Sequence, residues 1–124
     1  MKVGPCMSHL LKAGDEAQLE ACGWEALRVG DLVALDTDEG PKLHRFLGSR
    51  KTKAGRRLLT KGDRASHFDR ALPDGALLGR VAGIRRAGKL EVRPRGIPLA
   101  ELPAVAASLA RGLMALARRK ARPL

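Results

Sequence analysis

The sequence predicts a mainly β protein in which an antiparallel, partly closed sheet is followed by a C-terminal amphipathic α-helix. Up to about residue 98, short alternating or apolar runs are separated by turns that contain Gly and Pro, a pattern typical of antiparallel strands. From Glu101 onward, apolar residues instead recur at every third or fourth position, which is the period of a helix that buries one face. We therefore expect a β domain over residues 1–98 and a helix with a basic tail over residues 99–124.

The β domain divides into short strands with polar turns between them. Alternation or apolar runs predict strands over residues 15–21, 32–35, 42–48, 57–61, 76–85 and 89–93. Turn composition predicts breaks at residues 36–41, 62–63, 73–75 and 87–88, and a basic loop over residues 49–55. In the third of these strands, alternation places Leu43, Arg45 and Leu47 on one face and His44 and Phe46 on the other.

The C-terminal segment is expected to be helical from Glu101 to about Arg118. Pro103 suits the first helical turn, where a backbone N–H has no intrahelical partner to lose. We expect this helix to pack on the sheet. Basic residues beside an apolar face are also typical of a helix that lies on an anionic membrane surface, although Gly112 and the many alanines make that face shallow.

Length and cysteine content limit the class of protein. The 124 residues fit one domain, and this length can bury a core without disulfide or metal support. With only two cysteines, Cys6 and Cys22, we expect a reducing, cytoplasmic compartment, and a bridge between them stays an open alternative. Because there is no uninterrupted apolar run of about 20 residues and no apolar signal segment near Met1, we expect at most peripheral contact with a membrane.

The chain is strongly basic, and its charge is unevenly distributed. It carries 24 Lys and Arg against 13 Asp and Glu, for a net charge of +11. Residues 42–57 hold seven cations and no acid, and the tail from Arg111 is also free of acids. Such a surface attracts nucleic acid, anionic lipid or acidic peptides alike. Nucleic acid is the least expected of these partners, because one Trp, two Phe and no Tyr leave no platform for stacking bases.

Short motifs bring a thiol, an imidazole and a carboxylate into one ordered set. Gly4-Pro5-Cys6-Met7 is followed by Gly14-Asp15, eight residues after the cysteine. His44-Arg45 lies in a predicted strand. Thr60-Lys61-Gly62-Asp63 ends another strand, and Asp69 follows six residues later. A nucleophilic thiol needs a base and a group that orients the base, and this set contains all three.

In this order and spacing, the motifs resemble those of the signal peptidase I and repressor-type peptidase superfamily, in its His-containing form. The resemblance covers about residues 2–86 and includes the turn at Gly30-Asp31-Leu32-Val33. It implies the antiparallel β fold of that superfamily, with Cys6 as the nucleophile, His44 as the general base and Asp69 as the residue that orients His44. It further implies substrate or oxyanion contacts for Gly4, Cys6 and Met7, and structural roles for Gly14, Asp15, Lys61, Gly62 and Asp63.

The chain departs from the family pattern around the nucleophile. The family's Ser is Cys6 here, the Pro expected two residues after Met7 is His9, and a Ser that helps to stabilise the oxyanion is Gly4. An imidazole takes a proton from a thiol more readily than from an alcohol, because the reference pKa of a thiol is far lower. The oxyanion would depend on backbone N–H groups, and Pro5 has none, so the Cys6 amide is the expected donor.

Other candidates fit the pattern less well. Ser8 lies close to Cys6, but counting back from Gly14-Asp15 puts Cys6 at the family position. Lys61 belongs to a turn that the family uses structurally, and Lys42 matches no motif. The Cys and His residues lack the C-x2-C or H-x3-H spacing of zinc sites, so we expect no metal and no cofactor.

Two functions from different classes follow from these observations. The first is a peptidase that cleaves a polypeptide bound as an extended strand, with Cys6, His44 and Asp69 as its centre. The alternative is a catalytically weak or inactive module of the same fold, which binds a peptide or an anionic partner through the basic residues 42–57.

Overall fold

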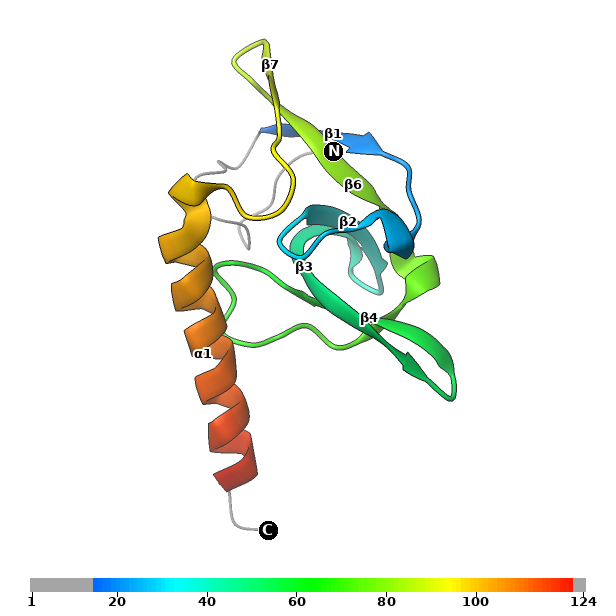
Figure 1. Ribbon diagram of the computed structural model, residues 1–124, viewed down its shortest axis with the longest axis vertical. Coiled ribbons are helices and arrows are strands. Elements are labelled where there is room, and N and C mark those ends of the chain that lie inside the picture. The colour runs from blue at the N-terminus through cyan, green and yellow to red at the C-terminus, as the bar shows by residue number, and fades with distance from the viewer. Residues whose placement is uncertain (1–14, 122–124) are drawn as a thin grey trace.

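The structure of the protein, a computed structural model, describes residues 15–121, with side chains as far as Arg119. One antiparallel sheet and one long helix make up most of it (Figure 1). The strands are β1 (Glu16–Glu20), β2 (Leu32–Thr37), β3 (Gly40–Thr52), β4 (Gly55–Lys61), β5 (Leu72–Pro73), β6 (Leu77–Arg86) and β7 (Lys89–Val92), and the helix is α1 (Leu102–Ala121). Short 3-10 turns cover Trp24–Ala26, Asp74–Ala76 and Leu99–Glu101.

The sheet has the strand order β1-β6-β2-β3-β4-β5, with β7 paired to β6, and every pairing is antiparallel. The expected fold class, mainly β with a C-terminal helix, is therefore confirmed. The sheet is open within residues 15–121, because its end strands β1 and β5 do not pair. In Figure 1, α1 lies along one side of the sheet and its C-terminal turns extend past the strands.

Apolar side chains cover both faces of the central strands. On one face, Leu32 and Ala34 of β2 belong to a buried cluster completed by Ala17, Leu43, Val81 and Ile84. On the other face, Val33 and Leu35 of β2 pack with Phe46 and Leu58. Burial of β2 on both sides explains its unbroken apolar run. His44 lies across from Val33 in the β2–β3 register, so it shares the Phe46 face, as alternation predicts.

The basic segment expected as a loop over residues 49–55 is a hairpin instead. β3 continues to Thr52 and β4 begins at Gly55, with Arg50 paired across from Arg57. The Thr52 hydroxyl closes the turn, because it donates to the Gly55 carbonyl at 2.7 Å and accepts from the Ala54 N–H at 3.2 Å. High charge favoured a loop in the sequence analysis, but strand pairing satisfies the backbone groups while the cations stay exposed.

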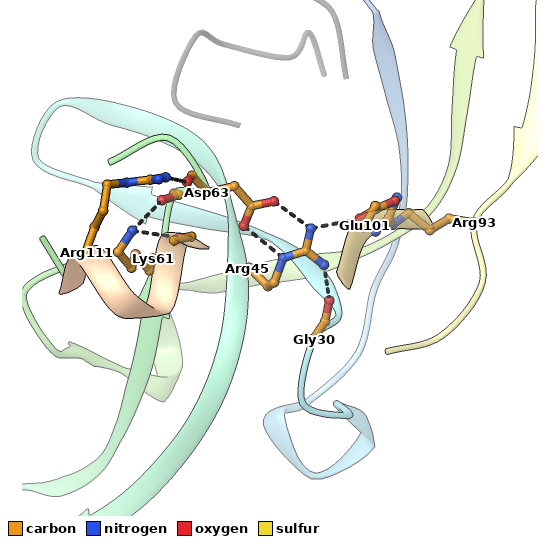
Figure 2. Close-up of polar contacts among 9 residues, drawn as sticks. Gly30, Arg45, Lys61, Asp63, Arg93, Glu101 and Arg111 are labelled. Carbon is orange, nitrogen blue, oxygen red and sulfur yellow. Dashed lines mark hydrogen bonds and ion pairs between the residues drawn. The ribbon is translucent and has the colours of Figure 1, made fainter. Parts of the chain in front are cut away.

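A buried network of ion pairs joins the sheet to the start of α1. Arg45 is 1% exposed and lies between two carboxylates (Figure 2). Its Nε and Nη2 donate to Asp63 at 2.9 and 2.6 Å, and Nη2 also donates to Glu101 at 2.8 Å. Its Nη1 donates to the Gly30 carbonyl at 2.8 Å. The guanidinium thus has both charge partners and hydrogen bonds, as a buried cation requires.

Glu101 is the acid through which this network reaches the helix. Arg93 donates to both of its carboxylate oxygens, at 2.7 and 2.5 Å. Burial alone would raise the pKa of Glu101, but hydrogen bonds from Arg93 and Arg45, together with their charges, outweigh burial and hold this pKa below its usual value. Because Glu101 immediately precedes α1, its carboxylate sets where the helix begins relative to β3.

The turn that precedes β2 anchors the connection between β7 and α1. The Asp31 carboxylate accepts from Arg95 Nη2 at 2.8 Å and from the Gly96 N–H at 2.7 Å. Gly30 has a φ of +97°, and a Cβ there would lie 2.3 Å from a side-chain carbon of Ile97. Only glycine meets both demands, because it tolerates positive φ and leaves room for the neighbouring chain.

Polar contacts and one glycine hold the middle of α1 beside the sheet. Lys61 Nζ, at the end of β4, donates to Ser108 Oγ at 2.7 Å, and Arg111 Nη2 donates to the Asp63 carbonyl at 2.7 Å. A Cβ at Gly112 would lie 2.7 Å from the Phe68 ring, so this glycine marks a close approach. Gly112 therefore lies on the inner face of α1 and not on its exposed apolar face.

α1 ends at Ala121, past the expected end near Arg118, and the expectation that no segment is long and apolar enough to span a bilayer needs correction. Leu99–Arg119 could cross a membrane by length and composition alone, and 22% of its most apolar stretch is buried. Arg111 is the one charged residue between Glu101 and Arg118. A search for uninterrupted apolar runs overlooks such a segment, because a single charge divides it.

Loss of the Glu101 charge should destabilise the fold strongly. We expect Glu101→Gln to lower the free energy of unfolding by about 3–5 kcal/mol, because it removes the one described carboxylate that pairs with the buried Arg93 and one of the two that pair with Arg45. Glu20→Gln is the matched control, because the Glu20 side chain stays 58% exposed in its ion pair with Arg80, and ion pairs with an exposed partner contribute less than about 1 kcal/mol. Urea unfolding measures both variants, and equal losses would contradict a special role for the buried network.

Candidate functional site

The candidate site is built around His44, in the middle of β3. His44 is 5% exposed, and its backbone pairs with Val33 of β2. The strand turns the next residue, Arg45, to the opposite face, where it joins the buried ion network. One strand thus presents a histidine on one side and is anchored by an arginine on the other.

The structure brings His44 and Asp69 into direct contact, although 25 residues separate them in the chain. His44 Nδ1 lies 2.5 Å from Asp69 Oδ2, and Thr60 Oγ1 donates to the same oxygen at 2.7 Å. The Asp69 N–H donates to the Thr60 carbonyl at 3.0 Å, which positions the backbone of Asp69 beside β4. Two local contacts with Thr60 therefore place the carboxylate for its contact with His44.

The carboxylate of Asp69 is held in its ionised form. Burial would raise the pKa of Asp69, but hydrogen bonds from His44 and Thr60, with smaller effects of nearby positive charge, hold this pKa below its usual value. An ionised carboxylate only accepts hydrogen bonds, so the proton of the short contact belongs to His44 Nδ1. In the neutral imidazole, Nε2 then carries the lone pair.

The second ring nitrogen of His44 has no partner. Nε2 is buried and forms no hydrogen bond with any residue that the structure describes. Buried polar atoms are nearly always paired, since leaving one unpaired costs free energy. An acceptor nitrogen that is oriented by a carboxylate and otherwise unused is the arrangement that a general base requires.

A cleft of about 460 Å³ lies beside this pair. One wall comes from the β2–β3 hairpin, from Leu35 to His44, and the other comes from the segment between Asp69 and Ala76. Its lining mixes carboxylates, cations and apolar side chains, including Leu35 and Leu72. The cleft could therefore accommodate a segment of polypeptide next to His44 and Asp69.

Several of the predicted site residues lie outside the described residues. These are Gly4, Cys6, Met7 and Gly14, so their positions relative to His44 stay predictions. Asp15 is described, and its carboxylate accepts from Arg86 Nη2 at 2.6 Å and from Arg86 Nε at 3.1 Å. This contact joins the start of β1 to the end of β6, away from His44.

The residues of the Thr60–Asp63 motif have structural contacts. Asp63 pairs with Arg45, as described above. Lys61 Nζ donates to Ser108 Oγ and to the carbonyls of Gly62 and Ala65. Burial and the nearby charge of Arg111 lower the pKa of Lys61, but its three N–H groups face three acceptors, so no lone pair is available for a base. Lys42 pairs with Glu39 at 3.1 Å and lines the cleft.

Sequence reasoning did not assign roles to Thr60, Arg93, Glu101 or Ser108. Thr60 holds Asp69, and the other three secure α1 or the segment before it. One signal was available for Glu101, because it is the only acid after Glu91 and is followed by a long uncharged stretch. Its pairing with Arg45 spans 56 residues, and local patterns carry no information on such a contact.

The described residues contain no metal-binding cluster, and the chain matches no known protein. Among residues 15–121, no three His, Cys, Asp or Glu side chains are close enough to share a metal ion. No protein-family model, curated protein or solved structure matches the chain. The resemblance to signal and repressor-type peptidases therefore stays a prediction from motifs.

Removal of the Asp69 charge should weaken the fold in a pH-dependent way. The folded protein lowers the pKa of Asp69. The Asp69 carboxylate therefore stabilises the fold at pH values above the pKa of an Asp in the unfolded chain, which is about 4. This stabilisation is lost as the pH falls through the lower pKa of Asp69 in the folded protein. We expect Asp69→Asn to lower the free energy of unfolding by about 2 kcal/mol near pH 7. This difference should shrink as pH falls below about 4.

Urea unfolding at a series of pH values measures this effect. Asp38→Asn is a suitable control, because Asp38 is exposed and no described residue pairs with it. A difference between wild type and Asp69→Asn that stays constant down to about pH 3 would contradict the account.

Proposed function

We propose that the protein is a peptidase in which Cys6 is the nucleophile and the His44–Asp69 pair is its general base. One observation carries the proposal: His44 Nδ1 is held by Asp69, while Nε2 is buried without a partner among the described residues. The order and spacing of the motifs around Cys6, His44 and Asp69 support it independently.

The proposed reaction is acyl transfer through a thioester. His44 Nε2 takes the proton of the Cys6 thiol, and the thiolate attacks the carbonyl carbon of the scissile peptide bond. When the tetrahedral intermediate collapses, the C–N bond breaks and the His44 imidazolium returns the proton to the leaving amine. His44 then deprotonates water, which hydrolyses the thioester and restores the thiol.

The other groups in this proposal orient or stabilise. Asp69 stays ionised, fixes the tautomer of His44 and stabilises the imidazolium when it forms. The Cys6 amide is the proposed oxyanion donor, because Pro5 has no N–H. The substrate is a polypeptide in extended conformation that enters the cleft beside His44. The reaction needs neither a metal nor a cofactor.

The alternative function, a module that binds an anionic partner, is favoured by the hairpin of β3 and β4. Arg50, Lys51 and Lys53 are exposed near its turn, and none of them pairs with an acid in the described part of the chain. The two functions differ in what they require of Cys6. Binding through the hairpin leaves Cys6 an ordinary thiol, whereas catalysis requires a thiol coupled to His44.

Alkylation by iodoacetamide tests this coupling without a known substrate. We expect Cys6 to react faster than Cys22 near neutral pH, with a midpoint below the value of about 8.5 for an ordinary thiol, because a neighbouring imidazolium stabilises the thiolate. In His44→Gln, the Cys6 midpoint should rise towards that value. Mass spectrometry of the digested protein follows both thiols in one sample, so Cys22 is an internal control.

His67→Gln is the matched control for the loss of an imidazole, because His67 is exposed and lies outside the His44–Asp69 pair. Its Cys6 profile should equal that of the wild type. Equal alkylation of both cysteines in the wild type, or a Cys6 profile that His44→Gln leaves unchanged, would contradict the proposed centre.

Hydrolysis of denatured casein tests the activity itself. We expect new peptide termini, detected by mass spectrometry, and a rate that falls about 100- to 10,000-fold in Cys6→Ala and in His44→Gln. Cys22→Ala should cleave at the wild-type rate. Cleavage that persists in Cys6→Ala, or the absence of any cleavage by a wild-type protein with a reactive Cys6, would count against a peptidase of this kind.

A further inference from the structure

The exposed side of α1 is apolar over most of its length. Leu113 is 61% exposed, Met114 is 55% exposed and Leu116 is 40% exposed. Exposed residues between Leu102 and Ala117 are all apolar except Arg111, whose guanidinium reaches back to the Asp63 carbonyl. A helix that faces water on one side normally carries charged residues there. A continuous apolar face of this kind indicates contact with another apolar phase or surface.

The opposite side of α1 packs against the rest of the protein. Val105, Ser108 and Gly112 are buried, and Ser108 accepts from Lys61. Leu113 and Met114 lie away from this buried stripe, whereas Leu116, four residues after Gly112, continues it and is still 40% exposed. The C-terminal turns also extend past the strands in Figure 1, where the sheet leaves them uncovered.

A groove widens the apolar surface beside the helix. Its volume is about 650 Å³, and its lining includes Leu59 and Phe68 from the sheet side and Leu113 and Leu116 from α1. Arg119 lines the same groove, and Arg118 shares a neighbouring cavity with Met114. Apolar side chains and exposed cations thus lie side by side along the last two turns.

We propose that the outer side of the last turns, formed by Leu113 and Met114 with Arg118 and Arg119 in the turn that follows, docks α1 onto an anionic lipid bilayer. Apolar side chains would enter the boundary between headgroups and acyl chains, while the arginines contact anionic headgroups. No acid follows Glu101 in the chain, so nothing on the helix repels such a surface. A second copy of the chain is a poorer occupant, because two molecules of net charge +11 repel each other.

The contacts of α1 favour a helix that lies in the plane of the bilayer surface. Length and composition alone would also allow Leu99–Arg119 to span it. However, Ser108 is bonded to Lys61, Arg111 is bonded to the Asp63 carbonyl, and Gly112 is close to Phe68. Insertion across the bilayer would break these contacts and carry the Arg111 charge into hydrocarbon.

The groove beside α1 adjoins the cleft of the candidate site. Asp69 and Arg70 line both the groove beside α1 and the cleft that contains His44. The inference does not rest on peptidase activity, because it concerns a different surface and its test measures only lipid binding.

Vesicle flotation of the full chain tests the proposal. We expect the protein to float with vesicles of equal phosphatidylglycerol and phosphatidylcholine and to stay behind with phosphatidylcholine alone. The double variant Leu113→Gln with Met114→Gln should bind at least about tenfold more weakly, since each substitution removes an apolar side chain from the lipid contact. Arg118→Gln with Arg119→Gln should weaken binding to anionic vesicles by about tenfold or more, and should lower its dependence on salt.

Leu90→Gln with Val92→Gln is the matched control, because these residues are 50% and 83% exposed on β7, outside the helix. Circular dichroism should show that all variants keep the wild-type fold. Failure to float with anionic vesicles, or equal binding by wild type and the Leu113/Met114 variant, would overturn the proposal. So would a lipid-free dimer, seen by sedimentation, that the Leu113/Met114 variant abolishes, because a second copy would then cover this face.

Discussion

The buried guanidinium of Arg45 is the contact on which the arrangement of this protein depends. It joins the turn before β2, the turn after β4 and the residue that precedes α1, through Gly30, Asp63 and Glu101. An arginine that is 1% exposed needs partners for both its charge and its N–H groups, so each of these segments must stay in place. The helix is consequently tied to the sheet by charge at its start and by packing farther along.

The candidate site uses the opposite side of the same strands. Strand alternation turns His44 away from Arg45, and at the end of β4 the Thr60 side chain holds Asp69 while Lys61 and Asp63 hold α1 and Arg45. In both strands, neighbouring residues therefore have different roles: some hold the fold together, and others position the side chains of the candidate site. This division of roles is a physical reason for finding Thr, Lys and Asp together in one short motif.

The two faces of the sheet, one with the Arg45 ion network and one with His44, differ in which buried polar atoms lack a hydrogen-bond partner. Lys61 and Asp63 have partners within the fold, and the one buried atom of the ion network without a partner among the described residues is Arg93 Nε, an N–H donor that has no lone pair to accept a proton. His44 Nε2 is different, because its ring is oriented by Asp69 and its remaining lone pair points to no described donor. An oriented but unpaired acceptor beside a cleft is the feature that connects the fold to the proposed chemistry.

Local patterns in the sequence were sufficient for the fold class, most strand positions and the C-terminal helix, whereas the choice of His44 and Asp69 as a pair came from the resemblance to the peptidase superfamily. Local patterns act through periodicity and short turns, which depend on neighbouring residues. Charge density misled the interpretation of residues 49–55, because strand pairing, and not composition, decides whether a basic segment is a loop. Only the tertiary structure could show that Glu101 pairs with Arg45, that Thr60 holds Asp69 and that Leu113 and Met114 lie on the outer face of α1. Each of these depends on which segments meet in space, and a sequence pattern shows that a helix has an apolar face without showing what that face contacts.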